Sequence, residues 1–164
     1  MIQRIQTLWL FFVVLLSVAT FFFPLAVFTF NFKGLEFHEL YTFIPSQVSL
    51  KSDAVVQTTP AYSLIFMQIG VGLIALISIF LFKNRGLQLK VLSSGFLLLA
   101  IYVGFLFFLK IDGLEKEIAE LYSKPSLSYG VSSYFPILQL LLLILAQRAI
   151  KKDERIVRSS DRLR

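Results

Sequence analysis

The chain has 164 residues, of which 57% are hydrophobic and 16% are charged, and its formal net charge at pH 7 is +6. A water-soluble domain with so few charged side chains would leave large apolar faces uncovered, so the composition favours a protein that folds in lipid. Cysteine is absent and His38 is the single histidine, which excludes disulfides and thiol chemistry and leaves too few ligands for a zinc site.

Four stretches of 28, 29, 19 and 23 residues contain no Asp, Glu, Lys or Arg. A helix needs about 20 apolar residues to cross roughly 30 Å of hydrocarbon. Each stretch therefore predicts one membrane-spanning helix, and the expected fold class is an all-α integral membrane protein built as a four-helix bundle. We expect the helices near residues 8–28, 62–82, 91–109 and 131–149, in a transmembrane domain of residues 1–150 followed by a tail of residues 151–164.

The first span has a competing interpretation, because its basic start and residues 17–19 fit a secretory signal peptide with a cleavage site. The apolar run continues to Phe28, which is long for a signal-peptide core and favours a permanent helix. Pro24 lies one turn before the expected end of this helix. It predicts a kink there that neighbouring helices absorb, with Thr20 bonding a freed carbonyl.

Lysine and arginine are distributed unequally over the two sides that four spans define. Eleven of the 16 lie on the side of both termini and the turn at residues 83–90, against five on the other side. Because loops rich in Lys and Arg remain in the cytoplasm, we expect both termini to be cytoplasmic. The net positive charge then reflects an unequal distribution of Lys and Arg across the bilayer. For this reason no specific nucleic-acid partner is expected.

The first outer loop, residues 29–61, alternates apolar and polar residues on both sides of Lys33-Gly34. This period of two around a glycine-containing turn predicts a small β-hairpin. Residues 54–56 and 48–50 offer further short strands. An isolated hairpin is only marginally stable in water, so we expect it to lie against the outer ends of the helices.

A helical extension is expected after the third span. Leu114, Ile118 and Leu121 recur at one-turn intervals among charged residues, which is typical of an amphipathic helix. Asp112 and Glu115 have the spacing of a capping box, so Asp112 is the expected N-cap. Residues 126–133 are interpreted as a polar turn before the fourth helix, whose first turns contain a proline.

Small residues recur at helical spacing on the second and third spans, where they allow helix backbones to approach closely in lipid. They are Ser63, Gly70 and Ser78 on the second span, and Ser93, Ala100 and Gly104 on the third. Packing within the bundle is the main interpretation. An interface with a second copy or with another membrane protein is the alternative.

Chemistry inside a membrane requires polar or ionisable side chains that face a cavity, and the four predicted spans contain no Asp, Glu, Lys, Arg or His. Gln68 and Gln139 are the most polar residues at depth. They predict either hydrogen bonds between helices or a small intramembrane polar site. Glu36, His38 and Glu39 form a weak cluster in the first loop, for which a solvated strand face is the preferred account. No catalytic residue, metal site or cofactor is expected.

The tail after the fourth span carries the densest charge. Its basic residues are Lys151, Lys152, Arg155, Arg158, Arg162 and Arg164. They fit an anchor against anionic lipid, where each contributes about 1 kcal/mol, or a contact surface for a protein partner. Interspersed acidic residues argue against a phosphate-binding tail.

The two chain ends carry a family resemblance. Residues 1–8 (MIQRIQTL), the motif Phe23-Pro24-Leu25 and residues 152–164 (KDERIVRSSDRLR) resemble an uncharacterised four-helix inner-membrane family, a domain of unknown function typical of Bacteroidetes. The resemblance spans the whole chain and implies the same topology in a bacterial inner membrane, without any activity or site residue. The architecture is also loosely similar to claudin-like tetraspan proteins, although the paired cysteines of their first loop are missing here.

The sequence thus favours a non-enzymatic accessory or scaffold subunit of a larger membrane assembly, with lipids and other membrane proteins or further copies as partners. The alternative is a binder or transporter of a lipid or small hydrophobic ligand, which uses a cavity around Gln68 and Gln139. An enzyme that acts at the outer surface through Glu36, His38 and acidic residues that follow the third span is a third possibility.

Overall fold

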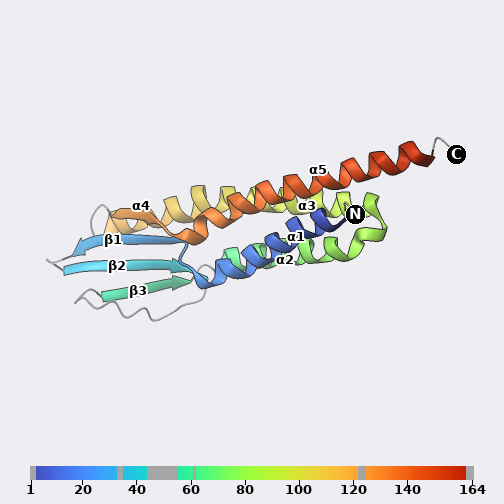
Figure 1. Ribbon diagram of the computed structural model, residues 1–164. Coiled ribbons are helices and arrows are strands. Elements are labelled where there is room, and N and C mark those ends of the chain that lie inside the picture. Colours follow the sequence, from blue (N-terminus) through green and yellow to red (C-terminus); the bar gives the residue numbers. More distant parts are fainter. Residues whose placement is uncertain (1–2, 33–34, 44–54, 61, 122–124, 162–164) are drawn as a thin grey trace.

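The computed structural model describes residues 3–32, 35–43, 55–60, 62–121 and 125–161. A bundle of four long helices carries a small β-sheet at one end, and the described ends of the first and last helices lie at the opposite end (Figure 1). We call these the sheet end and the terminal end. All four helices are long and apolar enough to cross a membrane, which confirms the four predicted spans.

The first helix, α1, covers Gln3–Ala19 and ends in a short 3-10 turn, η1, at Thr20–Phe22. It stops well before residue 28, so the predicted span was too long at this end and the predicted kink at Pro24 is wrong. Phe23 is extended, with φ −120° and ψ 150°, because the ring of a following proline disfavours helical backbone. Thr20 does donate to a helix carbonyl, that of Leu16, at 2.7 Å.

The sheet contains four strands in the order β3-β2-β1-β4. Strands β1 (Ala26–Phe32) and β2 (Leu35–Thr42) pair antiparallel, which confirms the predicted hairpin. Strand β3 (Val55–Pro60) runs parallel to β2, and β4 (Ser126–Tyr129) runs antiparallel to β1. The segment that forms β4 was predicted as a turn. The predicted all-α fold with a single hairpin therefore lacked this strand of the sheet. Residues 48–50 lie outside the described part.

The second helix, α2, covers Tyr62–Phe80 and continues as the 3-10 turn η2, Leu81–Lys83. Helix α3, Arg85–Gly104, begins beside it, and the Asn84 side chain caps α3 by accepting from the Leu87 N–H at 3.2 Å. The predicted third span therefore began too late, because Arg85 and the basic residues after it already belong to the helix. The two helices are antiparallel neighbours, as the tight turn predicted.

Helix α3 continues without a break through a π-helical segment, η3 (Phe105–Ile111), into α4 (Asp112–Leu121). This confirms the predicted helical extension. Asp112 is not an N-cap, because its backbone is helical (φ −64°, ψ −37°) and its N–H bonds the carbonyl five residues back. Its carboxylate instead accepts from Lys116 Nζ at 2.8 Å.

The last helix, α5, covers Phe135–Asp161 after a 3-10 turn, η4 (Val131–Tyr134). Pro136 lies in its first turn, as expected. Helix α5 continues through residue 150 into the basic tail as far as Asp161. It packs against α1 and α3, while α2 packs against α1 and α3, so the four helices form a closed ring.

The core of the bundle consists of apolar side chains that are almost fully buried, and large apolar side chains on the outer surface remain exposed for lipid. Helices α2 and α3 approach closely at Gly95, where an added Cβ would lie 2.6 Å from Ile74 Cγ2. Gly70 contributes in the same way against Leu98. The predicted small-residue face of the third span does not contribute to this contact, because Ser93 and Ala100 are exposed and Gly104 has no neighbour within 4 Å.

Candidate functional site

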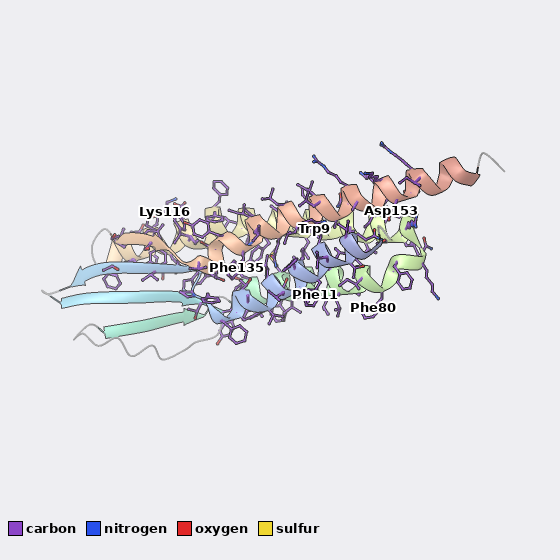
Figure 2. All side chains as sticks on the ribbon, viewed as in Figure 1. Trp9, Phe11, Phe80, Lys116, Phe135 and Asp153 are labelled. Atoms are coloured by element: carbon purple, nitrogen blue, oxygen red, sulfur yellow. The ribbon has the colours of Figure 1, made fainter. Side chains whose placement is uncertain are left out.

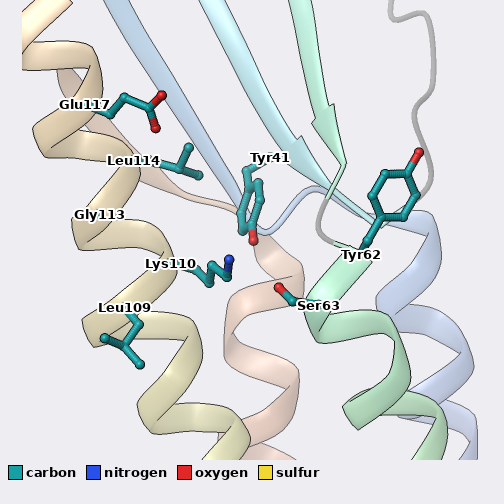
Figure 3. A pocket seen from close by; sticks show the side chains of 8 residues that line it. All are labelled: Tyr41, Tyr62, Ser63, Leu109, Lys110, Gly113, Leu114 and Glu117. Atoms are coloured by element: carbon teal, nitrogen blue, oxygen red, sulfur yellow. The ribbon is translucent and has the colours of Figure 1, made fainter.

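A pocket of about 490 Å³ lies at the sheet end, between the bundle and the sheet (Figure 3). Three parts of the chain meet there: the end of β2, the first turn of α2, and the continuous helix of η3 and α4. The described residues that line the pocket are Tyr41, Tyr62, Ser63, Leu109, Lys110, Gly113, Leu114 and Glu117. The volume is in the range of small-molecule sites, and the lining combines apolar, hydroxyl and charged side chains.

Lys110 provides the positive charge of the pocket. Its side chain points from η3 into the pocket (Figure 3), and its ammonium lies 5.4 Å from the centroid of the Phe105 ring. Within the described part of the chain Lys110 makes no ion pair, whereas nearby Lys116 is paired with Asp112 at 2.8 Å. No described acidic side chain therefore competes with an anionic ligand for Lys110. A π-helical segment at this position is notable, since such segments are frequent at functional sites.

Glu117 provides the negative charge. It lies seven residues after Lys110, about two turns further along the same helix towards the far end of the sheet, and it faces the pocket from that side (Figure 3). Glu117 also lacks an ion pair among the described residues. The pocket thus offers two separate opposite charges along one helix.

Tyr41 closes the pocket on the side of the sheet. Its ring is buried, and its hydroxyl points towards Lys110 and Ser63 (Figure 3). Burial raises the pKa of Tyr41 from 10.0 to about 12, so this phenol is neutral at physiological pH and retains its proton. Tyr41 can therefore donate a hydrogen bond to a ligand in the pocket.

Gln68 and Gln139 meet inside the bundle, where both are fully buried. Gln68 Nε2 lies 3.4 Å from Gln139 Oε1 and 3.2 Å from Thr20 Oγ1. Gln139 Nε2 donates to Ser17 Oγ at 2.9 Å and to the Val13 carbonyl at 3.2 Å. The two amides thus join α1, α2 and α5, as the hydrogen-bonding interpretation predicted.

An apolar groove of about 220 Å³ runs between α1 and α2 at the same depth. Gln68 and Ser17 line it, together with apolar residues, but Gln139 does not. The two glutamines therefore do not share this groove, and the buried Gln68 Oε1 has no hydrogen-bond partner in the described structure.

A third polar region lies at the terminal end, where Asp153 is only 5% exposed (Figure 2). Arg85 Nη1 donates to its backbone carbonyl at 3.0 Å, and Gln88 Nε2 donates to the Ser78 carbonyl at 2.9 Å. These bonds fasten α5 to α3 and α3 to α2. Asp153 Oδ1 is buried without a hydrogen-bond partner in the described structure.

The structure distributes the other predicted residues widely. Lys151, Lys152 and Arg155 are exposed on α5, whereas the side chain of Arg158 and both Arg162 and Arg164 lie outside the described part. Glu36, His38 and Glu39 belong to β2 by their backbone, but their side chains are also outside it. Within the described residues, no group of three His, Cys, Asp or Glu side chains is placed to bind a metal ion.

The sequence analysis did not predict the pocket at the sheet end. Lys110 is the first charge after an uncharged stretch and Tyr62 opens α2, so each marks the end of a span. These positions indicate a membrane boundary but not a pocket, because the pocket also requires Tyr41 from the sheet.

A family model described as Domain of unknown function (DUF4293) matches residues 2–163, which is nearly the whole chain. No curated protein and no solved structure matches the chain.

Proposed function

We propose that this chain, which belongs to the family of unknown function DUF4293, is a non-enzymatic multi-pass membrane protein that serves as an accessory or scaffold subunit of a larger membrane assembly. The observation that carries the proposal is the length of α5, which continues past the rest of the bundle as one helix (Figure 1). Its residues 151–161, which we call the basic arm, present Lys151, Lys152 and Arg155 to solvent.

The arm is held firmly at its base. Asp153 is buried, and the bond from Arg85 to its carbonyl fixes this turn of α5 against α3. A rigid projecting helix loses less conformational entropy on binding than a free tail does, which supports a role in contacting a partner.

We place the arm in the cytoplasm and the sheet outside a bacterial inner membrane. The excess of Lys and Arg at the terminal end supports this orientation. Part of the basic charge would then contact anionic lipid, where each Lys or Arg contributes about 1 kcal/mol. A protein partner is expected to use the side of the arm that faces away from the membrane.

A non-enzymatic role is supported by the composition of the spans. They supply no acid, base or nucleophile with a base beside it, and the buried amides bond one another and nearby hydroxyls. The alternative, a ligand binder or transporter built around Gln68 and Gln139, has less support because the two side chains bond each other and Gln139 does not line the groove between α1 and α2.

The experiment compares complexes extracted from native membranes in mild detergent. The wild-type chain is expected to migrate in a complex much larger than its own 18.7 kDa plus detergent. Replacing Lys151, Lys152 and Arg155 together by Gln should release the chain from that complex. These three side chains are exposed, so the fold should persist.

The control replaces Lys83 and Lys90 by Gln, which removes basic charge from the same end of the bundle outside the arm. This variant should keep the complex. Wild-type protein that migrates as a single copy would refute the accessory role, and an arm variant that keeps the complex would refute the arm as its contact surface. Two differently tagged copies distinguish self-association from a different partner.

A further inference from the structure

The pocket at the sheet end lies where the apolar surface of the bundle stops. Tyr62 begins α2, and Lys110 is the first charged residue after the 19-residue uncharged stretch in the third long helix. Tyrosine and lysine are typical of the interface between hydrocarbon and water. The pocket is therefore at the level of lipid head groups, whichever side of the membrane the sheet occupies.

Directly towards the membrane interior, the surface beside the pocket is apolar and open. Leu109 lines the pocket and is 62% exposed, and Phe66, one turn after Tyr62 on the neighbouring helix, is 78% exposed. These side chains offer contact to acyl chains. A ligand with a polar head in the pocket and apolar chains along this surface would satisfy both regions.

The charges of the pocket are ordered along the membrane normal. Lys110 lies nearer the apolar surface and Glu117 lies about two turns further out. A phospholipid with an amine in its head group has the same order, because its phosphate is attached next to the glycerol and the amine follows at the outer end. An anionic head group without an amine would place no positive charge near Glu117.

Two hydroxyl groups lie beside Lys110, where a phosphate would bind. Ser63 faces Lys110 across the pocket, and the Tyr41 hydroxyl points between them (Figure 3). Ammonium and hydroxyl donors that converge on one point form the short, charge-assisted hydrogen bonds that phosphate oxygens accept. Neither charged residue has a competing ion pair among the described residues.

We propose that this pocket binds the head group of an aminophospholipid, with its phosphate at Lys110, Ser63 and Tyr41 and its amine at Glu117. The acyl chains lie along the apolar surface of the bundle. This inference does not depend on the accessory role proposed above, and it assigns the chain a specific lipid rather than general immersion in lipid.

The experiment uses the full-length chain, stripped of lipid in detergent, and counts bound lipids by native mass spectrometry. The probes are phosphatidylethanolamine, phosphatidylglycerol and the chain-free head group glycerophosphoethanolamine. The wild-type chain should bind phosphatidylethanolamine about tenfold more tightly than phosphatidylglycerol. Glycerophosphoethanolamine should bind far more weakly, because it lacks the acyl chains.

Two variants separate the two charges. Lys110→Met removes the phosphate contact and should weaken the binding of both phospholipids about tenfold. Glu117→Gln removes the amine contact and the repulsion of anionic lipid, so the preference for phosphatidylethanolamine over phosphatidylglycerol should fall about tenfold. Lys110→Gln serves as a second variant if the methionine variant is unstable.

Matched controls on the same helix are Lys116→Met and Glu120→Gln, which change the same charges at exposed positions outside the pocket. Both should bind within about twofold of the wild type. The proposal is overturned if Lys110→Met binds like Lys116→Met, or if Glu117→Gln leaves the preference between the two phospholipids unchanged. Tight binding of glycerophosphoethanolamine would show that the acyl chains are not needed and would refute a membrane lipid as the ligand. None of these results would affect the test of the basic arm.

Discussion

Among the glycines that the structure describes, Gly130 is the one at which an added methyl group should damage the fold most. It lies between β4 and η4, and its N–H donates to the Leu25 carbonyl at 2.9 Å. A Cβ built on Gly130 would lie 2.7 Å from the Pro24 carbonyl carbon and would overlap the Pro24 oxygen. Its backbone angles, φ −73° and ψ 161°, are ordinary, so the requirement for glycine comes from close approach and not from an unusual conformation.

The expected cost of Gly130→Ala follows from this contact. Ordinary contacts begin at 3.4 Å, and both neighbouring atoms belong to the backbone, so the two segments must separate. Overpacking of this kind costs about 1–3 kcal/mol, and losing the bond from Gly130 to Leu25 adds about 1 kcal/mol. We expect the free energy of unfolding to fall by about 2–4 kcal/mol, which lowers the melting temperature by roughly 4–16 °C for a chain of this size.

The assay is thermal unfolding of the purified protein in detergent, followed by circular dichroism. Gly104→Ala is the control, because Gly104 ends α3 and has no neighbouring atom within 4 Å of the added Cβ. Alanine favours the helix over glycine by about 0.8–1 kcal/mol, so this variant should melt at or above the wild-type temperature. If Gly130→Ala unfolds within about 0.5 kcal/mol of the wild type, the tight junction between β4 and Pro24 is refuted.

Three further predictions concern the bundle and its orientation in the membrane. Gln139→Leu should lower the free energy of unfolding in detergent by about 1–2 kcal/mol, because its interhelical hydrogen bonds are lost; an unchanged stability would contradict their importance. Arg85→Leu should loosen the terminal end of α5 and speed hydrogen exchange of the amides around Asp153, whereas Lys83→Gln should leave this exchange unchanged. Because the chain has no cysteine, Lys116→Cys and Lys83→Cys each provide a single thiol, and a membrane-impermeant reagent added to intact cells should label only the first. Equal labelling would contradict the proposed orientation.

The helices were predictable because the membrane imposes a simple requirement. Each uncharged stretch long enough to cross the bilayer contains one long helix, and the tight turn before α3 made α2 and α3 neighbours. The predicted helix ends were less accurate, because helices continue past the hydrocarbon into regions where charged side chains are tolerated. Arg85 and Lys90 both belong to α3, although the uncharged stretch begins only after Lys90. Pro24 was misplaced inside a helix because hydropathy alone does not distinguish an apolar strand from an apolar helix.

The sheet and the pocket depend on contacts between distant segments. Residues 126–129 (SLSY) do alternate, but four residues are too few for periodicity alone to predict a strand, and they form β4 by pairing with β1. The pocket requires Tyr41, Ser63 and Lys110, which are far apart in the sequence and belong to three different elements. Periodicity identifies each element separately, whereas the meeting point depends on how the sheet rests on the bundle.

The π-helical segment η3 also determines what a change in chain length would do. A π-helical turn is an α-helical turn with one extra residue, and one residue corresponds to about 100° of rotation in an α-helix. Deleting one residue from 105–109 would therefore turn the rest of this helix, including α4, about its own axis instead of merely shortening the molecule. Lys110 and Glu117 would swing away from Tyr41, while α3 and its packing stayed in place. The angular setting of α4 relative to α3 is thus controlled by this one segment.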